Sequence, residues 1–376
     1  MFFKDIPGQE IVKNRLIRMV NEQRIPHAML FLGNDGGGNL PMSIAFAQFV
    51  LCKNKLQDES CGACPSCLKI KNLAHPDLHL VFPFVLSKEI RVSEQKMAEF
   101  RKSFLNNPFM NQQIWLDELN ALNKQITIPA EQSISIIKSL NYTSFEGGYK
   151  FMIIWCPEKM NNTLANKLLK ILEEPPEKTI FILVCHQYDL LLSTVISRTQ
   201  LVKFSLNTDS EIKNYLIQKG INEQQATNAA KLADGNAGNA IAIINEDAES
   251  GELSLLEHFQ QFMRLCLKFN PFKINQWIDQ TSALGREKQK QFFNYGLQLI
   301  RDCLIINHAN EKIIKSDPQE LDFLRKFAPF IHYNNIEQLI EEFNKTIYHI
   351  ERNANSKMVL MDFSLKINEL LNVKKS

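Results

Sequence analysis

The sequence has almost no net charge, no long apolar run and no biased tract. Lys and Arg number 43 against 41 Asp and Glu, so the whole molecule is not a strongly basic nucleic-acid binder. Its longest apolar runs, such as TIFILVC, are far too short to span a bilayer. The N-terminus, MFFKDIPGQE, is charged early and lacks the apolar core of a secretory signal. These absences predict a cytoplasmic globular protein with no membrane partner.

The first two hundred residues alternate short apolar runs with helical patterns. Strands are expected over 28–33, 78–84, 149–156, 179–185 and 200–204, and helices over 9–23, 40–53, 130–140 and 161–174. Several of the strands are apolar throughout, as in parallel sheets that are covered on both faces. The alternation predicts an α/β domain with a parallel sheet.

The pattern changes after Phe204. Two short helices are expected over 208–221 and 222–235, and only long amphipathic helices from about residue 250 onward. The predicted domains are therefore an α/β domain over 1–205, a small helical lid over 206–248 and an all-α domain over 249–376. At 376 residues, the chain is long enough for three domains.

A glycine-rich loop, GNDGGGN, follows the first expected strand. Gly33 and Gly38 have the spacing of the phosphate-binding pattern G-x-x-x-x-G-K-[ST], but Asn39 and Leu40 stand where Lys and Ser or Thr are needed. The acidic residue that would hold Mg²⁺ on a neighbouring strand is also absent, because that strand ends in Trp155 and Cys156. The loop is either an ordinary glycine-rich turn or a degenerate nucleotide site. In both cases ATP hydrolysis by this chain is not expected. The candidate loop residues are Gly33, Gly36, Gly37, Gly38, Asn39 and Leu40.

Four of the eight cysteines lie within sixteen residues, in the spacing C-x8-C-x2-C-x2-C. Cys52, Cys61, Cys64 and Cys67 suit tetrahedral Zn²⁺, and four protein ligands leave no open position, so the ion would be structural. An iron–sulfur cluster is the alternative, but the fourth cysteine would then follow three residues later, and residue 71 is Lys. Free thiols are the third possibility. The other cysteines are expected to be buried small apolar residues.

Several segments together resemble the delta-prime family of bacterial DNA polymerase III clamp-loader subunits, within the AAA+ superfamily. The similarity is strongest over 149–204, which contains LLKILEEPP and TVISRTQ, and weak from about 250 to 350. IPGQ at 6–9, IPHAMLFLG at 25–33, the four-cysteine insert and RNANSKMVLMDFSLKINELL at 352–371 also match. The resemblance implies an α/β P-loop AAA+ (RecA-like) domain with a zinc module, a helical lid and an all-α collar that mediates oligomerisation.

The resemblance also implies a function. Such a subunit is a non-hydrolysing scaffold in a ring with gamma/tau and delta subunits, which loads the sliding clamp on primed template DNA. Arg198, in the segment written S-R-C in the family, would reach across a subunit boundary to a neighbour's ATP, positioned by Ser197. Thr199 replaces the family's Cys. The lid position that carries an arginine in related ATPases is Gly238.

Two other functions stay open at this point. One is an active gamma/tau-like AAA+ ATPase with a divergent P-loop, which turnover by the isolated chain would reveal. The other is a zinc-containing DNA-binding module, which would bind duplex DNA in a salt-dependent manner. The near-neutral charge and the position of the cysteines inside an α/β domain disfavour the second.

Overall fold

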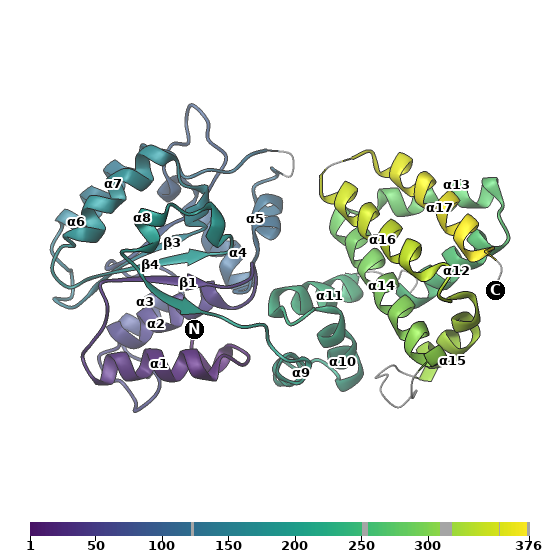
Figure 1. The fold of residues 1–376 in the computed structure, drawn as a ribbon. Coiled ribbons are helices and arrows are strands. Elements are labelled where there is room, and N and C mark those ends of the chain that lie inside the picture. The colour runs from purple at the N-terminus through teal and green to yellow at the C-terminus, as the bar shows by residue number, and fades with distance from the viewer. Residues whose placement is uncertain (122–123, 250–254, 309–317, 353, 374–376) are drawn as a thin grey trace. The chain divides into compact units, whose positions relative to one another are not determined.

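The computed structural model describes residues 1–376 apart from 122–123, 250–254, 309–317, 353 and 374–376. The chain forms two compact units, Met1–Glu249 and Ser250–Ser376 (Figure 1). Within the described residues, no helix is both long enough and apolar enough to cross a membrane.

The first unit is built on a five-stranded sheet in the order β2-β3-β4-β1-β5, with every neighbouring pair parallel. The strands are β1 (Ala28–Leu32), β2 (Leu78–Val81), β3 (Lys150–Trp155), β4 (Thr179–Cys185) and β5 (Gln200–Lys203). Each lies inside a run that was predicted to be a strand. The predicted parallel α/β sheet is therefore confirmed.

Alternate side chains of the central strands enter two separate cores. Phe31, Ile153 and Ile182 pack on one face, and Leu30 and Leu183 on the other. Period-two alternation sends successive side chains to opposite faces, so apolar runs such as TIFILVC serve both cores at once.

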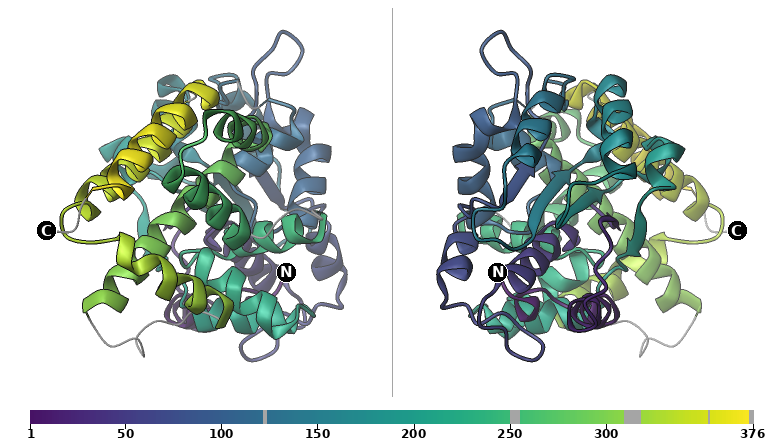
Figure 2. Two further views of the ribbon diagram at one scale, coloured as in Figure 1. Left: turned by 90° about the vertical axis from the view of Figure 1, so that its right-hand side faces the viewer. Right: turned by 90° about the vertical axis from the view of Figure 1, so that its left-hand side faces the viewer.

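Helices cover both faces of this sheet, as two further views show (Figure 2). The face that bears Phe31 packs against α1 (Glu10–Asn21) and α2 (Asn39–Leu51), and α3 (Pro65–Lys71) contacts α2. The other face packs against α6 (Gln132–Asn141), α7 (Asn162–Glu173) and α8 (Ser193–Ile196). Helix α2 is buried all round, because β1, β3, β4 and α3 all contact it.

The remaining elements of this unit are short helices. They are α4 (Met97–Asn106), α5 (Gln112–Glu118), α9 (Asp209–Gln218), α10 (Glu223–Leu232) and α11 (Ala237–Glu249), with 3-10 turns at Phe3–Asp5, Ser93–Lys96, Pro157–Lys159 and Tyr188–Leu190. Thr208 and Asn222 cap α9 and α10 through their side chains. Gly235 ends the α10 segment with φ 73°, in the left-handed region that favours glycine.

The second unit is helical throughout its described residues. Its helices are α12 (Leu255–Leu267), α13 (Pro271–Ala283), α14 (Arg286–His308), α15 (Pro318–Phe327), α16 (Ile336–Glu351) and α17 (Ser356–Leu371), with a 3-10 turn at Ala328–Phe330. Stacked and edge-to-face aromatic rings fill its core, with Phe262 lying between Trp277 and Phe363.

Candidate functional site

The glycine loop connects the carboxyl end of β1 to the first residue of α2, as in a phosphate-binding loop. Gly36 and Gly38 have φ values of 76° and 101°, which a side chain would strain. Gly33 lies so close to Phe204 that an added Cβ would approach the Phe204 Cβ to 2.8 Å. Backbone conformation and close packing therefore explain why glycine occupies these positions.

The two side chains that replace the Lys and the hydroxyl turn into the protein. Asn39 is 1% exposed, and its Nδ2 donates to the carbonyl of Gly33 at 3.3 Å and weakly to that of Cys185 at 3.5 Å. Its Oδ1 accepts from the backbone N–H of Leu40 at 3.1 Å. The Leu40 side chain lies in the core beneath the sheet. The Asn39 side chain thus satisfies one backbone N–H group in the first turn of α2.

The start of α11 lies directly against the loop. Gly238 N donates to Gly36 O at 3.1 Å, and Asn236 Nδ2 donates to Asp35 O at 2.6 Å. A Cβ at Gly238 would meet the carbonyl oxygen of Phe109 at 2.4 Å. A side chain at position 238 would displace Phe109 or Gly36, so the start of α11 packs tightly against both the loop and the 107–110 segment.

Asp35 fastens a second segment to the loop. Its Oδ2 accepts from the backbone N–H of Gln112 at 2.7 Å, and its Oδ1 lies 3.3 Å from Nε2 of His186. Burial raises the pKa of this carboxyl, while the neighbouring His186 acts in the opposite direction. β3 ends in Trp155 and has no acidic residue at its last position, but two carboxylates lie near the loop. Asp35 is within it, and Glu158, three residues past the end of β3, shares the neighbourhood of His186.

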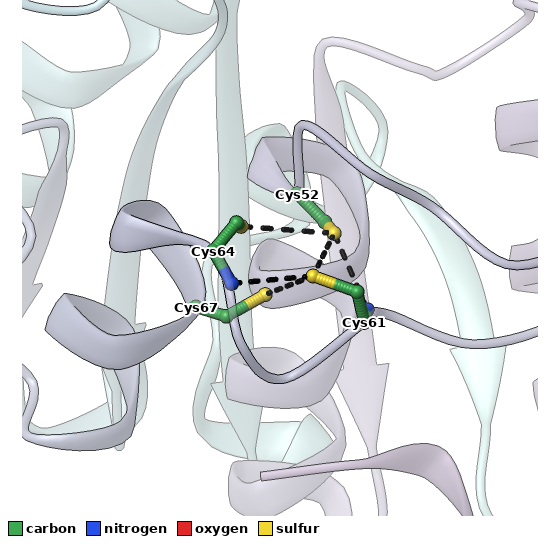
Figure 3. A group of neighbouring side chains, drawn as sticks. All are labelled: Cys52, Cys61, Cys64 and Cys67. Atoms are coloured by element: carbon green, nitrogen blue, oxygen red, sulfur yellow. Dashed lines mark hydrogen bonds between the residues drawn. The ribbon is translucent and has the colours of Figure 1, made fainter.

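The four predicted cysteines come together between α2 and α3 (Figure 3). Cys52 follows the last residue of α2, Cys64 is the N-cap of α3, and Cys67 lies within α3. The Sγ–Sγ separations are 3.5 Å for Cys52–Cys61 and 4.0 Å for both Cys52–Cys64 and Cys61–Cys67. Four sulfurs bound tetrahedrally at about 2.3 Å from one ion lie about 3.8 Å apart. The four thiols can therefore hold one metal ion.

The backbone around Cys61 favours its thiolate. Cys61 N donates to Cys52 Sγ and Cys64 N donates to Cys61 Sγ, both at 3.3 Å. Backbone N–H groups of Ala63 and Cys64 hold the pKa of the Cys61 thiol below its usual range. Gly62, at φ 71°, makes the turn between these cysteines, and Phe2 covers it so closely that a Cβ would approach the ring to 2.5 Å.

Glu146 ties this module to the loop that precedes β3. It accepts from Ser66 Oγ at 2.7 Å and pairs with Lys69 at 3.0 Å and Lys53 at 2.9 Å. These three partners, Lys53 foremost, lower the pKa of Glu146 to about 2. No sequence motif points to this role, because Glu146 lies far along the chain from the cysteines.

Arg198 lies in the turn between α8 and β5, with its side chain about one-third exposed. Nε donates to Glu173 Oε1 at 2.8 Å, and Nη2 donates to the same oxygen. Nη1 donates to Thr194 O at 2.9 Å and to Ser197 Oγ at 3.4 Å. Ser197 thus contacts the guanidinium as expected. Thr199 Oγ1 donates to Ile196 O at 3.0 Å, which secures the turn.

Arg198 and the glycine loop lie at opposite ends of the parallel strands. β5 runs parallel to β1, Arg198 precedes β5, and the loop follows β1. Gln200, two residues after Arg198, pairs with Met29, whereas Phe204 N donates to Leu32 O beside Gly33. The four residues of β5 span about 13 Å at about 3.3 Å per residue. Arg198 therefore cannot serve a ligand on its own loop.

Comparisons with known proteins agree on one family. A family model described as DNA polymerase III, delta subunit matches residues 8–208. DNA polymerase III subunit delta' of Bacillus subtilis (strain 168) is 28% identical over 323 residues, which cover 82% of this chain and 81% of that protein. The Escherichia coli (strain K12) subunit delta' is 21% identical over 364 residues, covering 95% and 93%. DNA polymerase III subunit tau of Bacillus subtilis is 27% identical over 262 residues, covering 68% of this chain but 39% of that protein.

Proposed function

This chain belongs to the DNA polymerase III delta subunit family, whose model matches residues 8–208, and on that premise we propose that it is a non-catalytic delta-prime subunit of a bacterial clamp loader. The Bacillus subtilis and Escherichia coli relatives named subunit delta' are matched across most of their length, and the family model is that of the delta subunit, whereas the tau relative of Bacillus subtilis is matched over 39% of its length. The delta-prime function therefore takes precedence over the gamma/tau-like alternative.

The chain itself does not hydrolyse ATP in this proposal. Three observations support it: Asn39 and Leu40 turn inward, Gly238 N donates to Gly36 O, and the loop lacks the phosphate-binding lysine. A scaffold subunit needs the fold of an ATPase for its interfaces, and not its chemistry.

Arg198 acts in trans. Arg198 lies at the amino end of β5, whereas its own glycine loop follows the carboxyl end of β1. This separation is the observation that supports the role. A guanidinium offered to a neighbour's γ-phosphate stabilises the charge that develops there, and such residues contribute on the order of 10³–10⁵ in rate. Ser197 and Thr194 O hold one end of the guanidinium while Glu173 occupies the other until a phosphate competes for it.

The four cysteines hold structural Zn²⁺. Thiolate ligands and tetrahedral spacing suit zinc, and the absence of a cysteine at residue 71 argues against the iron–sulfur arrangement. The ion would fix α3 to the end of α2 and supplies no reaction chemistry.

The partners that follow are gamma/tau and delta subunits, with the sliding clamp and primer–template DNA reached through the complex in the cytoplasm. The three-part division at 1–205, 206–248 and 249–376 gives each part a role: AAA+ domain, lid and oligomerising collar. The helical second unit, Ser250–Ser376, supports the last assignment.

Reconstitution with gamma/tau and delta subunits tests the proposal. Arg198→Ala should leave assembly intact and slow ATP turnover at the interface it serves, with clamp loading reduced in parallel. Arg198→Lys should rescue little, because Lys cannot reproduce the planar fork. Arg18→Ala, which removes an exposed arginine side chain from α1, is the matched control. Unchanged turnover and loading with Arg198→Ala would refute the trans role, and ATP turnover by the isolated chain would favour the active-ATPase alternative.

A further inference from the structure

A second group of metal-ligating side chains lies at the carboxyl ends of β1, β3 and β4, separate from the four-cysteine module. Cys156 and Glu158 follow β3, His186 follows β4, and Asp35 lies in the loop after β1. The ligand atoms of Cys156, Glu158 and His186 all lie within 4.8 Å of one another. Asp35 Oδ1 is 3.3 Å from His186 Nε2. These strands are adjacent in the sheet, so the cluster spans its centre.

Several buried polar atoms of this cluster make no hydrogen bond of good geometry. Within the described residues these are both carboxylate oxygens of Glu158, together with His186 Nε2 and Asp35 Oδ1, which lie 3.3 Å apart as an ion pair. The His186 side chain is only 4% exposed. Buried polar atoms almost always have a partner, and unsatisfied ones call for an explanation such as an ion. The unmet hydrogen-bonding capacity of Glu158, beside the clustered ligand atoms of Cys156 and His186, points to a bound cation.

The imidazole of His186 is oriented for metal binding. Its Nδ1 lies 3.2 Å from the carbonyl oxygen of Gly33, which can accept the Nδ1–H. That tautomer leaves the Nε2 lone pair facing Asp35 and Glu158, and metal-ligating histidines are commonly fixed by such a bond to a carbonyl. The amide of Asn39 lies 3.3 Å from the same Nδ1 and would favour the other tautomer in the absence of an ion.

The backbone also brings the thiol and the carboxylate together. Cys156 adopts φ 54°, a left-handed conformation that few residues other than glycine accept, and the 3-10 turn Pro157–Lys159 follows at once. This reversal returns Glu158 to the end of β3 beside Cys156.

We propose that this cluster is a second zinc site, with Cys156 Sγ, Glu158 and His186 Nε2 as its three protein ligands and Asp35 beside His186. A mixed thiolate, imidazole and carboxylate set suits Zn²⁺ and disfavours Mg²⁺ or Ca²⁺, which prefer oxygen ligands alone. The ion would link the ends of three strands at the position where the glycine loop begins. It is a structural crosslink that operates without nucleotide, and it does not rest on the clamp-loader assignment.

Zinc stoichiometry of the isolated full chain tests this site, with Zn²⁺ alone as the probe. After incubation with excess Zn²⁺ and gel filtration, the chain should retain about two ions, one in the four-cysteine module and one in this cluster. His186→Ala and Cys156→Ser should each lower the content to about one ion. Cys64→Ser should also leave about one ion, in the second site. Cys266→Ser, which changes a buried cysteine of the other unit, is the control and should retain both.

Two measurements keep the test decisive. If His186→Ala or Cys156→Ser fails to fold, Glu158→Gln preserves the shape of the side chain and should weaken Zn²⁺ retention at this site. Co²⁺ substituted into the Cys64→Ser chain should give tetrahedral absorption bands with a thiolate charge-transfer band that Cys156→Ser removes. A chain that retains only the cysteine-module ion, with His186→Ala and Glu158→Gln unchanged in zinc content, would overturn the proposal.

Discussion

Arg198 and Glu173 form an ion pair that joins the turn before β5 to the last residue of α7. Nε of Arg198 donates to Glu173 Oε1 at 2.8 Å, while Glu173 itself stays half-exposed. The pair lies within reach of solvent, so it positions the guanidinium more than it stabilises the fold. In the proposed trans role, a neighbouring phosphate would replace the carboxylate while Thr194 O and Ser197 Oγ retain the other side of the fork.

Removal of this pair should have little effect on stability. Glu173→Gln and Arg198→Ala are each expected to change the free energy of unfolding by less than about 1 kcal/mol, the usual range for exposed pairs. Denaturant titration of the isolated chain measures this. A loss of several kcal/mol would mean that Arg198 is a structural residue, and the effect of Arg198→Ala on the complex would then need another explanation.

Long apolar segments were the part of the fold that the sequence predicted best. All five strands and helices such as α7 were expected, because their burial leaves a continuous or periodic apolar pattern. Short helices such as α3, α4 and α5 were not expected, since seven to ten residues with few apolar positions carry little periodicity. Pro65 at the first position of α3 was the one local signal that could have revealed it.

The functional sites also differ in how far the sequence predicted them. The four cysteines and the glycine loop are contiguous motifs, so spacing alone identified them. The contacts of Asp35 with His186 and of Arg198 with Glu173 depend on strand order and helix packing, and those are set by the whole sheet. Cys156 was expected to be an inert buried thiol, and only the turn after β3 places it beside Glu158 and His186.

Loss of the four-cysteine module should destabilise the first unit. Cys64→Ser removes the N-cap ligand of α3, and losing a structural metal is among the few changes that exceed about 4 kcal/mol. Thermal unfolding followed by circular dichroism, with zinc content measured on the same sample, checks this. Cys266→Ser should keep its zinc and lose far less stability. Wild-type stability in Cys64→Ser would show that the cysteines are independent free thiols.

Restoring the motif residues should not restore nucleotide binding. Asn39→Lys with Leu40→Thr recreates the loop sequence, yet Asn236 and Gly238 still hold Asp35 and Gly36 through their backbone carbonyls. The new lysine would enter a position that is 1% exposed. A loss of at least about 2 kcal/mol in unfolding free energy is expected. Calorimetric titration with Mg²⁺–ATP should detect no binding, and tight binding would show that the lid opens readily.

Tyr215 provides a pH test of how firmly the lid is packed. Its ring meets Phe109 edge-to-face at 5.5 Å, and Phe109 O lies against Gly238. Burial, with a smaller contribution from Asp5, raises the pKa of Tyr215 to about 12. An unfolded tyrosine ionises near pH 10, so the unfolded state gains stability first as the pH rises. The native state should lose stability between pH 10 and about 12 from this group.

Tyr215→Phe should remove that loss while keeping the ring contact. The difference in unfolding free energy between wild type and Tyr215→Phe should stay constant below about pH 9 and shift by about 2 kcal/mol toward the variant near pH 11.5. Urea titrations at matched pH values measure this difference. The ionisation of the lysines, the thiols and the other tyrosines contributes equally to both proteins and cancels. A pH-independent difference would mean that Tyr215 ionises freely, and that α9 is not packed against Phe109 in solution. The closed loop would then lose one of its supports.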